Sequence, residues 1–359
     1  MLPYFILLFI VVILSSLAQK FRLNKNFAAF FIFLTFLFLV LFPGLRDANV
    51  GTDTNNYVGS FKSERNDEYS VLEIKSSLEI GYLYIERLAK NISSQYWVLL
   101  TLIAAIAINF YAKTIMVLST NYGISFFVFI TLASYLFIFN GARQGIAAAI
   151  FSFSIINMLK GNFKKYLFWI GIAFLFHKTV LLTIPMYFLF RQNFSIKNLI
   201  IIIISSTILI AFSFQLLSFL PESFSFRYTQ YQDRGASGGA LLTLFFIVIT
   251  IFFIITHKFI ATKNKKYYDI FLNMSIFHTL IYAIVFALGL DVNLMRLSQY
   301  FALGFVFIWP IIFQETNVKL KPILTLFFVF GHLGFYYIYL SKMSNLAPYI
   351  LNTQLFNNY

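Results

Sequence analysis

Long apolar stretches alternate with short polar segments along the whole chain. They cover residues 3–19, 27–43, 97–118, 123–139, 144–159, 166–176, 179–190, 197–219, 240–260, 270–289, 297–313 and 322–341. A helix crosses the hydrocarbon core of a bilayer with about 20 apolar residues, whereas a strand of a membrane β-barrel alternates apolar and polar residues. Stretches such as LLTLFFIVITIFFII do not alternate. The pattern therefore predicts an all-α polytopic integral membrane protein with about 12 membrane segments.

The composition supports the same class of protein. The chain is 60% hydrophobic and 11% charged, whereas a soluble domain carries about 25% charged residues. We expect a single transmembrane domain over residues 1–359. The chain has no cysteine, which excludes disulfides and thiol nucleophiles. The net charge of +14 does not call for a nucleic-acid partner, because membrane proteins concentrate lysine and arginine in cytoplasmic loops.

Basic clusters at residues 20–25, 160–165, 258–266 and 319–321 set the predicted orientation, since such clusters face the cytoplasm. If residues 166–192 formed one span, the 258–266 cluster would lie outside. If they form two half-spans that turn at His177, every cluster lies inside. Each half has roughly 12 residues, or roughly 18 Å of helix, which is too short to cross a bilayer. We therefore predict a re-entrant pair with His177 at its tip.

The predicted orientation places the long segment 44–96 outside the membrane. The helical spacing of apolar residues over 71–92 predicts an amphipathic helix near the membrane surface. Several arginines also fall outside, against the usual trend, and these are Arg46, Arg65, Arg87, Arg143, Arg227, Arg234 and Arg296. The planar guanidinium matches a phosphate bidentately, which suggests an anionic ligand such as pyrophosphate. Pairing with external acids explains Arg65 and Arg87 equally well, but Arg143 has no acid nearby in the sequence.

Six short stretches, in this order, resemble the EpsG family, part of the Wzy-type O-antigen and exopolysaccharide polymerases. They are GLRDANVGTDTNNYV (44–58), EIGY (79–82), FNGARQGIAAAIF (139–151), AFLFHKTVLLTIP (173–185), RYTQY (227–231) and RLSQYF (296–301). The residues that match the family are Arg46, Gly51, Asp53, Tyr57, Glu79, Tyr82, Arg143, His177, Arg227, Arg296 and Tyr300.

The resemblance implies a membrane glycosyltransferase of GT-C-like architecture, an oligosaccharide repeat unit polymerase of O-antigen, capsule or exopolysaccharide biosynthesis. Such an enzyme transfers a growing glycan from undecaprenyl pyrophosphate to another lipid-linked repeat unit. It would work in the bacterial cell inner (cytoplasmic) membrane, with its active site on the external, periplasmic face. The implied partners are undecaprenyl-pyrophosphate-linked oligosaccharide, membrane lipid and, as a further candidate, a chain-length regulator protein.

This transfer has to stabilise the leaving pyrophosphate and to remove a proton from the acceptor hydroxyl. The chain has no Asp-x-Asp pair of the kind that holds a metal ion in many glycosyltransferases. We therefore expect metal-independent chemistry without a cofactor, in which arginines bind the pyrophosphate. The candidates are Arg46, Arg143, Arg227 and Arg296. Asp53 would pair with an arginine or contact a sugar.

His177 is the leading candidate for the catalytic base, because histidine side chains titrate near neutral pH. Asp53 and Glu79 are rivals. An oxocarbenium-like transition state needs little activation of the acceptor, and His177 would then only cap the hairpin turn. Aromatic residues that either stack on sugars or belong to the aromatic belt at the membrane interface are Tyr57, Tyr82 and Tyr300.

Two other functions remain open from the residues alone. A flippase or other transporter of the same lipid-linked oligosaccharide would show inverted repeats and charges at mid-membrane, and neither is visible. An O-antigen ligase of similar architecture is separated from a polymerase only by which family the stretches match.

Overall fold

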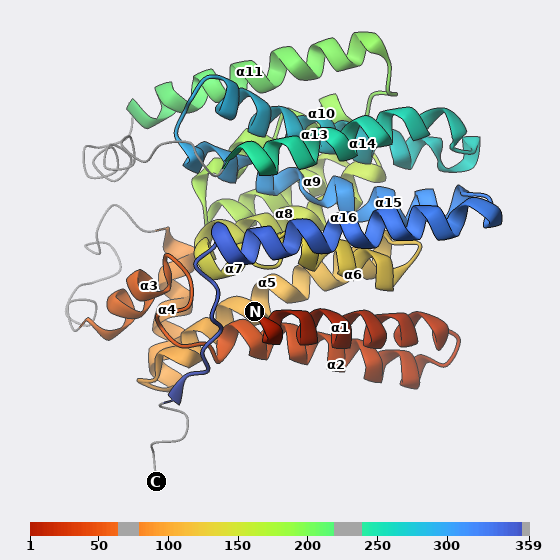
Figure 1. The fold of residues 1–359 in the computed structure, drawn as a ribbon. Helices are drawn as coiled ribbons and strands as arrows, with labels where there is room; N and C mark the ends of the chain where they lie inside the picture. Colours follow the sequence, from red (N-terminus) through yellow and green to blue (C-terminus); the bar gives the residue numbers. More distant parts are fainter. Residues whose placement is uncertain (64–78, 219–238, 354–359) are drawn as a thin grey trace.

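The computed structural model describes residues 1–63, 79–218 and 239–353. These residues form helices, most of which run alongside one another (Figure 1). Within these ranges, extended backbone pairs only at an isolated antiparallel bridge between Arg46 and Leu351. The described chain therefore confirms the all-α class.

Residues 1–159 contain, in order, α1 (Leu2–Lys20), α2 (Lys25–Gly44), α3 (Thr54–Lys62), α4 (Ile80–Ile92), α5 (Tyr96–Leu118), α6 (Tyr122–Thr131), α7 (Phe137–Asn140) and α8 (Ala142–Leu159). The rest of the described chain contains α9 (Phe163–Phe174), η2 (Lys178–Thr183), α10 (Met186–Phe190), α11 (Ile196–Ser218), α13 (Gly239–Thr256), η3 (His257–Phe259), α14 (Thr262–Ala287), η4 (Val292–Phe301), α15 (Leu303–Glu315), η5 (Val318–Leu320) and α16 (Lys321–Lys342).

Asparagine side chains start three of these helices. Asn24, Asn121 and Asn162 each accept a hydrogen bond from a backbone N–H of the first turn, at 3.3, 3.0 and 3.0 Å. This contact satisfies one of the donors that a helix start leaves unpaired. The polar caps explain why α2, α6 and α9 begin where the apolar pattern resumes.

The described chain has seven helices that are long and apolar enough to cross a membrane, or eight if the pair η4 and α15, bent by 48°, is one span. This is fewer than the predicted number of about 12. The other predicted segments are shorter helices. The stretch 123–139 breaks after α6, and the stretches 166–176 and 179–190 form the short elements α9, η2 and α10. In α11, the apolar part that the structure describes in full is Ile196–Phe212. A multi-pass membrane protein is nevertheless what these helices define.

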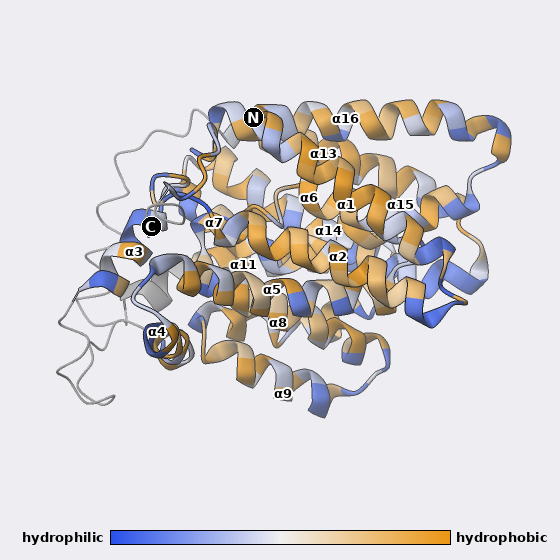
Figure 2. Ribbon diagram, turned by 90° about the horizontal axis from the view of Figure 1, so that it is seen from below, coloured by the Kyte–Doolittle hydropathy of each residue, from blue (hydrophilic) through white to orange (hydrophobic). Residues whose placement is uncertain are grey.

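The polar segments gather at the two ends of the helix bundle, and hydrophobic residues cover the length between them (Figure 2). At one end, which we call the basic end, the turns with the lysine clusters meet. Gln19 donates to Thr120 O at 2.8 Å, Asn264 donates to Glu315, and the rings of Phe194 and His257 lie 5.0 Å apart. The loop 45–53, α3, α4 and residues 344–353 lie at the opposite end, which we call the site end (Figure 1).

Residues 163–190 form the predicted hairpin. Tyr166 Oη on α9 donates to Thr183 O at 2.7 Å, and the rings of Phe163 and Phe188 lie 5.1 Å apart. The Arg191 guanidinium lies next to Gly161, so the segment leaves and re-enters the same end of the bundle. His177 lies at the turn, directly before η2, as the sequence predicted.

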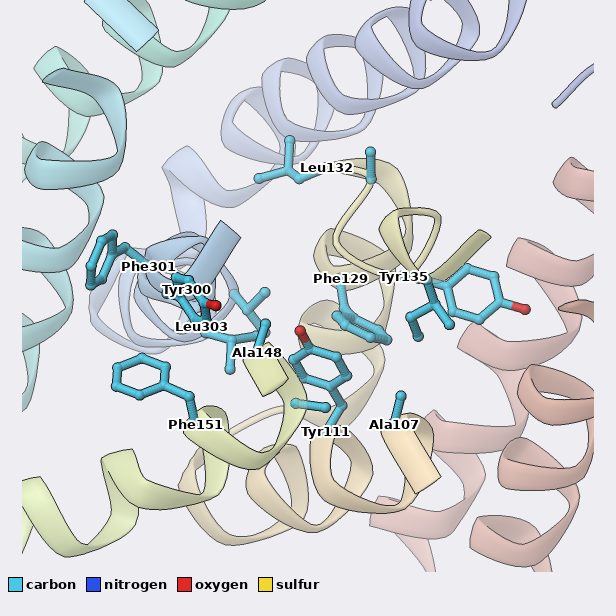
Figure 3. Packing of buried hydrophobic residues seen from close by; sticks show 14 of the residues in the cluster. Ala107, Tyr111, Phe129, Leu132, Tyr135, Ala148, Phe151, Tyr300, Phe301 and Leu303 are labelled. Carbon is cyan, nitrogen blue, oxygen red and sulfur yellow. The ribbon is translucent and has the colours of Figure 1, made fainter. Parts of the chain in front are cut away.

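Tight packing in the middle of the bundle fixes the helices that carry the site. Figure 3 shows side chains of α5, α6, α8 and the η4–α15 pair gathered in one cluster, with Tyr111, Phe151 and Tyr300 among them. Small residues allow close approach between neighbours: a Cβ on Gly304 would lie 2.6 Å from Phe271 O. Such small-residue contacts are typical of helices packed in membranes.

Candidate functional site

Three separate parts of the chain bring charged groups together at the site end. Glu79, at the start of α4, contacts Arg143 of α8 through Oε2 and Nη1, at 2.5 Å. Its other oxygen, Oε1, contacts Nδ1 of His177 at the hairpin tip, at 2.9 Å. Glu79 is 7% exposed. We call Glu79, Arg143 and His177 the Glu79 cluster.

A close backbone contact holds Glu79 against the hairpin. The N–H of Gly81 donates to Leu175 O at 2.8 Å. A Cβ at position 81 would lie 2.7 Å from the same carbonyl oxygen, so a glycine is needed for α4 to approach so closely. The glycine of the EIGY stretch thus places the preceding carboxylate beside His177.

Glu79 is an anion throughout the neutral range. Burial alone would raise its pKa, but the hydrogen bond with His177 and the charge of Arg143 outweigh burial and lower the pKa to about 2. A group with so low a pKa is a poor proton acceptor near neutral pH, so Glu79 is disfavoured as the base. Since the carboxylate can only accept, the proton of a neutral His177 lies on Nδ1 and leaves Nε2 as an acceptor.

Replacing Glu79 with glutamine is expected to lower thermal stability most above pH 4.5, and the difference from the wild type shrinks as the pH falls towards 2. The stabilisation belongs to the carboxylate, whose pKa is depressed from 4.5 to about 2, so it is complete above the unfolded value and is lost on protonation. Melting curves in detergent at a series of pH values measure this. A difference that stays constant down to pH 3, within the range between these two values, would contradict it.

A second, looser ion pair joins two further candidates. Arg296 Nη1 of η4 and Asp53 Oδ2 are 3.4 Å apart, and the Arg296 side chain is 40% exposed. Its backbone is held more firmly, because Gln144 donates to Arg296 O at 2.9 Å. Gln144 directly follows Arg143, so the start of α8 carries one arginine and fixes the backbone of the other. Asp53 pairs with an arginine, which is one of the two roles that the sequence left open.

The three tyrosines lie around this site but differ in what they can contact. Tyr57 Oη accepts a hydrogen bond from the N–H of Ala142 at 3.0 Å. The Tyr300 hydroxyl and Thr179 Oγ1 are 2.8 Å apart and link η4 to the hairpin. Tyr82 and Tyr300 are 1% and 2% exposed, so their rings pack in the interior. The structure therefore does not support sugar stacking by Tyr82 and Tyr300.

Arg46 also differs from its predicted role. It is 2% exposed, and its guanidinium donates to Pro43 O, Thr54 Oγ1 and Phe139 O while packing over the Phe139 ring at 4.6 Å. Burial is the main reason that its pKa falls to about 10. Because these donors are directed at the protein itself, Arg46 holds the loop 45–53 in place and does not face a pyrophosphate.

The remaining candidate, Arg227, lies in the stretch 219–238, outside the residues that the structure describes. His257, at the basic end, pairs with Asp269 at 2.6 Å. Among the described residues, no group of three or more His, Cys, Asp and Glu side chains is arranged to hold a metal ion.

Sequence reasoning missed the residues that connect the site. Gln144, Asn140 and Thr179 make the contacts between segments, and each lies within a stretch that the sequence analysis singled out for its family resemblance. The acid partner of Arg143 was also missed, because Glu79 is 64 positions away in the sequence.

The fold and the site together define a multi-pass membrane protein with a cluster of charged residues at one end of its helix bundle. A profile described as the EpsG family matches residues 29–351, which include every candidate discussed above. The chain therefore belongs to the EpsG family, a polysaccharide polymerase-like family. No curated protein and no solved structure matches the chain.

Proposed function

We propose that the chain is a polysaccharide polymerase, which transfers glycan from undecaprenyl pyrophosphate to a lipid-linked oligosaccharide repeat unit. The observation that carries this proposal is the Glu79 cluster, in which one buried carboxylate holds both an arginine and a histidine. The two needs of the reaction, a cation for the leaving pyrophosphate and a proton acceptor for the hydroxyl, are then met side by side.

Arg143 and Arg296 would bind the pyrophosphate. Only one nitrogen of Arg143 is engaged by Glu79, and a guanidinium has five N–H donors in a planar fork, so others remain for a ligand. The Gln144 side chain holds the Arg296 backbone beside the start of α8, and the charges of Arg143 and Arg296 both act on the Tyr57 hydroxyl. Because these two cations replace the charge of a metal ion, we propose a metal-independent reaction.

His177 would act as the base, and Glu79 would orient it. The acceptor oxygen forms a bond to the anomeric carbon while the bond from that carbon to the pyrophosphate oxygen breaks. The hydroxyl proton moves to Nε2 of His177, and undecaprenyl pyrophosphate leaves. Glu79, held in its ionised form, stabilises the imidazolium that results, in the way that a buried carboxylate supports a catalytic histidine in other enzymes.

Asp53 would be displaced from Arg296 when the pyrophosphate binds, and would then be free to contact a sugar hydroxyl. Its pair with Arg296 is long and partly exposed, and exposed pairs of this kind are weak. The Asp53→Asn variant is therefore expected to lower KM for the donor about two- to fivefold, because a competing anion is removed. Initial rates at varied donor concentration measure this. A rise in KM would mean that Asp53 instead orients Arg296 for the ligand.

The site would lie on the external face of a bacterial cytoplasmic membrane, since the basic end carries the clusters that favour the cytoplasm. The chain has no cysteine, so single cysteines can be placed without background. Asn56→Cys in α3 is expected to react with an impermeant maleimide in intact spheroplasts, and Thr262→Cys only after lysis. Both side chains are exposed, Asn56 at the site end and Thr262 at the basic end. Labelling of both before lysis would contradict the proposed orientation.

Loss of the gene separates this function from its alternatives. Without a polymerase, lipid carriers on the external face should each hold a single repeat unit. Without a flippase, single units would accumulate on the cytoplasmic face, and without a ligase, long polymer would remain on undecaprenyl pyrophosphate. Extraction and mass analysis of lipid-linked glycans distinguishes the three outcomes, and only the first supports the proposal.

A further inference from the structure

The residues that follow α16 fold back along the loop 45–52, beside the site. The Asp47 N–H donates to Ile350 O at 2.9 Å, the Asn352 N–H donates to Leu45 O at 2.9 Å, and the Gly51 N–H donates to Asn345 O at 3.0 Å. The loop and residues 344–352, which we call the C-terminal segment, thus run antiparallel to each other (Figure 1).

The C-terminal segment is anchored on the bundle and is not a loose end. Tyr4 Oη donates to Leu346 O, and Leu346 is fully buried. The Tyr349 ring stacks on Phe42 with centroids 4.2 Å apart, and its hydroxyl donates to Phe42 O at 2.7 Å. The segment therefore connects α1 and the end of α2 to the loop that leads into the site.

Asn140 joins this arrangement to the helix that carries Arg143. Its Oδ1 accepts a hydrogen bond from the Thr52 N–H at 2.9 Å, and its Nδ2 donates to Ser344 O at 2.9 Å. Gly51 fits against it: a Cβ there would lie 2.5 Å from Asn140 Oδ1, and φ of Gly51 is +101°, which L side chains rarely adopt. Asn140 ends α7, directly before α8.

We propose that Asn140 is a positioning residue, which together with the C-terminal segment clamps the loop 45–52 against the start of α8. The side-chain amide has an oxygen that accepts and a nitrogen that donates, and the clamp uses both atoms, for two backbone groups from opposite ends of the chain. Thr52 precedes Asp53, so the clamp sets where that carboxylate meets Arg296. This inference rests on the proposed function for its effect on turnover, but the clamp itself is testable without it.

The test is hydrogen exchange of the full-length protein, resolved to single amides. In Asn140→Asp the carboxylate still accepts from the Thr52 N–H but opposes Ser344 O, so the amides of Asp47 and Gly51 should exchange about tenfold faster while Thr52 stays protected. In Asn140→Ala, which loses both contacts, Thr52 should exchange faster as well. Unchanged exchange at all three amides in Asn140→Ala would overturn the clamp.

A second variant tests whether the C-terminal segment carries the effect. Tyr349→Phe removes only the hydroxyl that donates to Phe42 O, and should speed exchange of the same loop amides. In the double variant with Asn140→Asp, the loop amides should exchange little faster than in Asn140→Asp alone, because both substitutions release the C-terminal segment. Tyr122→Phe removes a comparable hydroxyl contact to Met116 O at the basic end and should leave the loop unchanged. If the increases in exchange rate caused by Asn140→Asp and Tyr349→Phe add in full in the double variant, the two residues do not share one clamp.

Turnover measured on the same variants separates the two proposals. For Asn140→Asp we expect kcat to fall about tenfold with no rise in KM for the donor, because Arg143 and Arg296 keep their places on packed helices. A fall in affinity without a fall in kcat would show that Asn140 does not position the loop for the reaction. If the loop amides of the variants exchange faster as expected but the wild-type protein makes no polymer, the clamp is supported and the proposed function is rejected.

Discussion

Replacing Arg143 with lysine is expected to reduce polymerase turnover about 10- to 100-fold, although the charge is kept. The Glu79 carboxylate takes one nitrogen of the guanidinium, and the proposed reaction uses the others to hold the pyrophosphate. A lysine ammonium can keep the contact with Glu79 but loses the planar fork. One lost charge-assisted hydrogen bond in the transition state costs about 1.5–3 kcal/mol.

The amount of Arg143→Lys protein in the membrane should stay close to that of the wild type, because the side chain is 23% exposed and its ion pair is kept. Arg22→Lys, at an exposed position of the basic end, is the matched control and should retain full turnover. Polymer of normal length and amount from Arg143→Lys, at equal protein level, would remove Arg143 from the site.

Replacing His177 with asparagine is expected to reduce turnover at least about 100-fold with little change in KM. Asparagine can still donate a hydrogen bond to Glu79 Oε1, so the cluster keeps its shape, but it has no nitrogen that takes up a proton.

His257→Asn is a matched control for this variant. His257 also pairs with a carboxylate, Asp269 at 2.6 Å, but at the basic end, so its loss should leave turnover nearly unchanged. If His177→Asn kept wild-type kcat, then the acceptor needs no base, and the reaction would proceed through an oxocarbenium-like transition state in which His177 only caps the hairpin turn.

The sequence predicted those features that depend on segment length and charge. The hairpin at His177 followed from two apolar halves that are each too short to cross a bilayer, and the structure has Gly161 and Arg191 meeting at its base. The same reasoning separated the basic clusters from the charged motifs, and those motifs that the structure describes lie at the opposite end of the bundle from the clusters. These features could be predicted because hydrophobic length and the placement of lysine are local properties of a chain.

The sequence could not show where uniformly apolar stretches break. Residues 123–139 were predicted as one segment, because no proline marks the interruption and their only glycine, Gly123, lies at the start. The structure ends α6 at Thr131 and turns the chain at Ala133, whose φ is +62°. Tertiary packing sets such a break, and a pattern of apolar residues does not reveal it.

Pairings between distant residues were also beyond the sequence. Arg143 had no acid nearby, yet Glu79 approaches it because Gly81 brings α4 against the hairpin. Arg46 had the same local appearance as the other external arginines, but the loop 45–53 folds over it and directs its donors to Thr54 and backbone carbonyls. Which arginine faces solvent depends on how its loop folds, and composition does not determine this.

The most direct test of the account is reconstitution of the purified chain in liposomes with the lipid-linked repeat unit that a deletion strain accumulates, in buffer with EDTA. The account predicts a ladder of polymer lengths and release of undecaprenyl pyrophosphate, with the rate of release lowered about 10- to 100-fold by Arg143→Lys and at least about 100-fold by His177→Asn. A folded wild-type protein that makes no polymer, polymer that appears only when magnesium is added back, or equal ladders from all three proteins would contradict it.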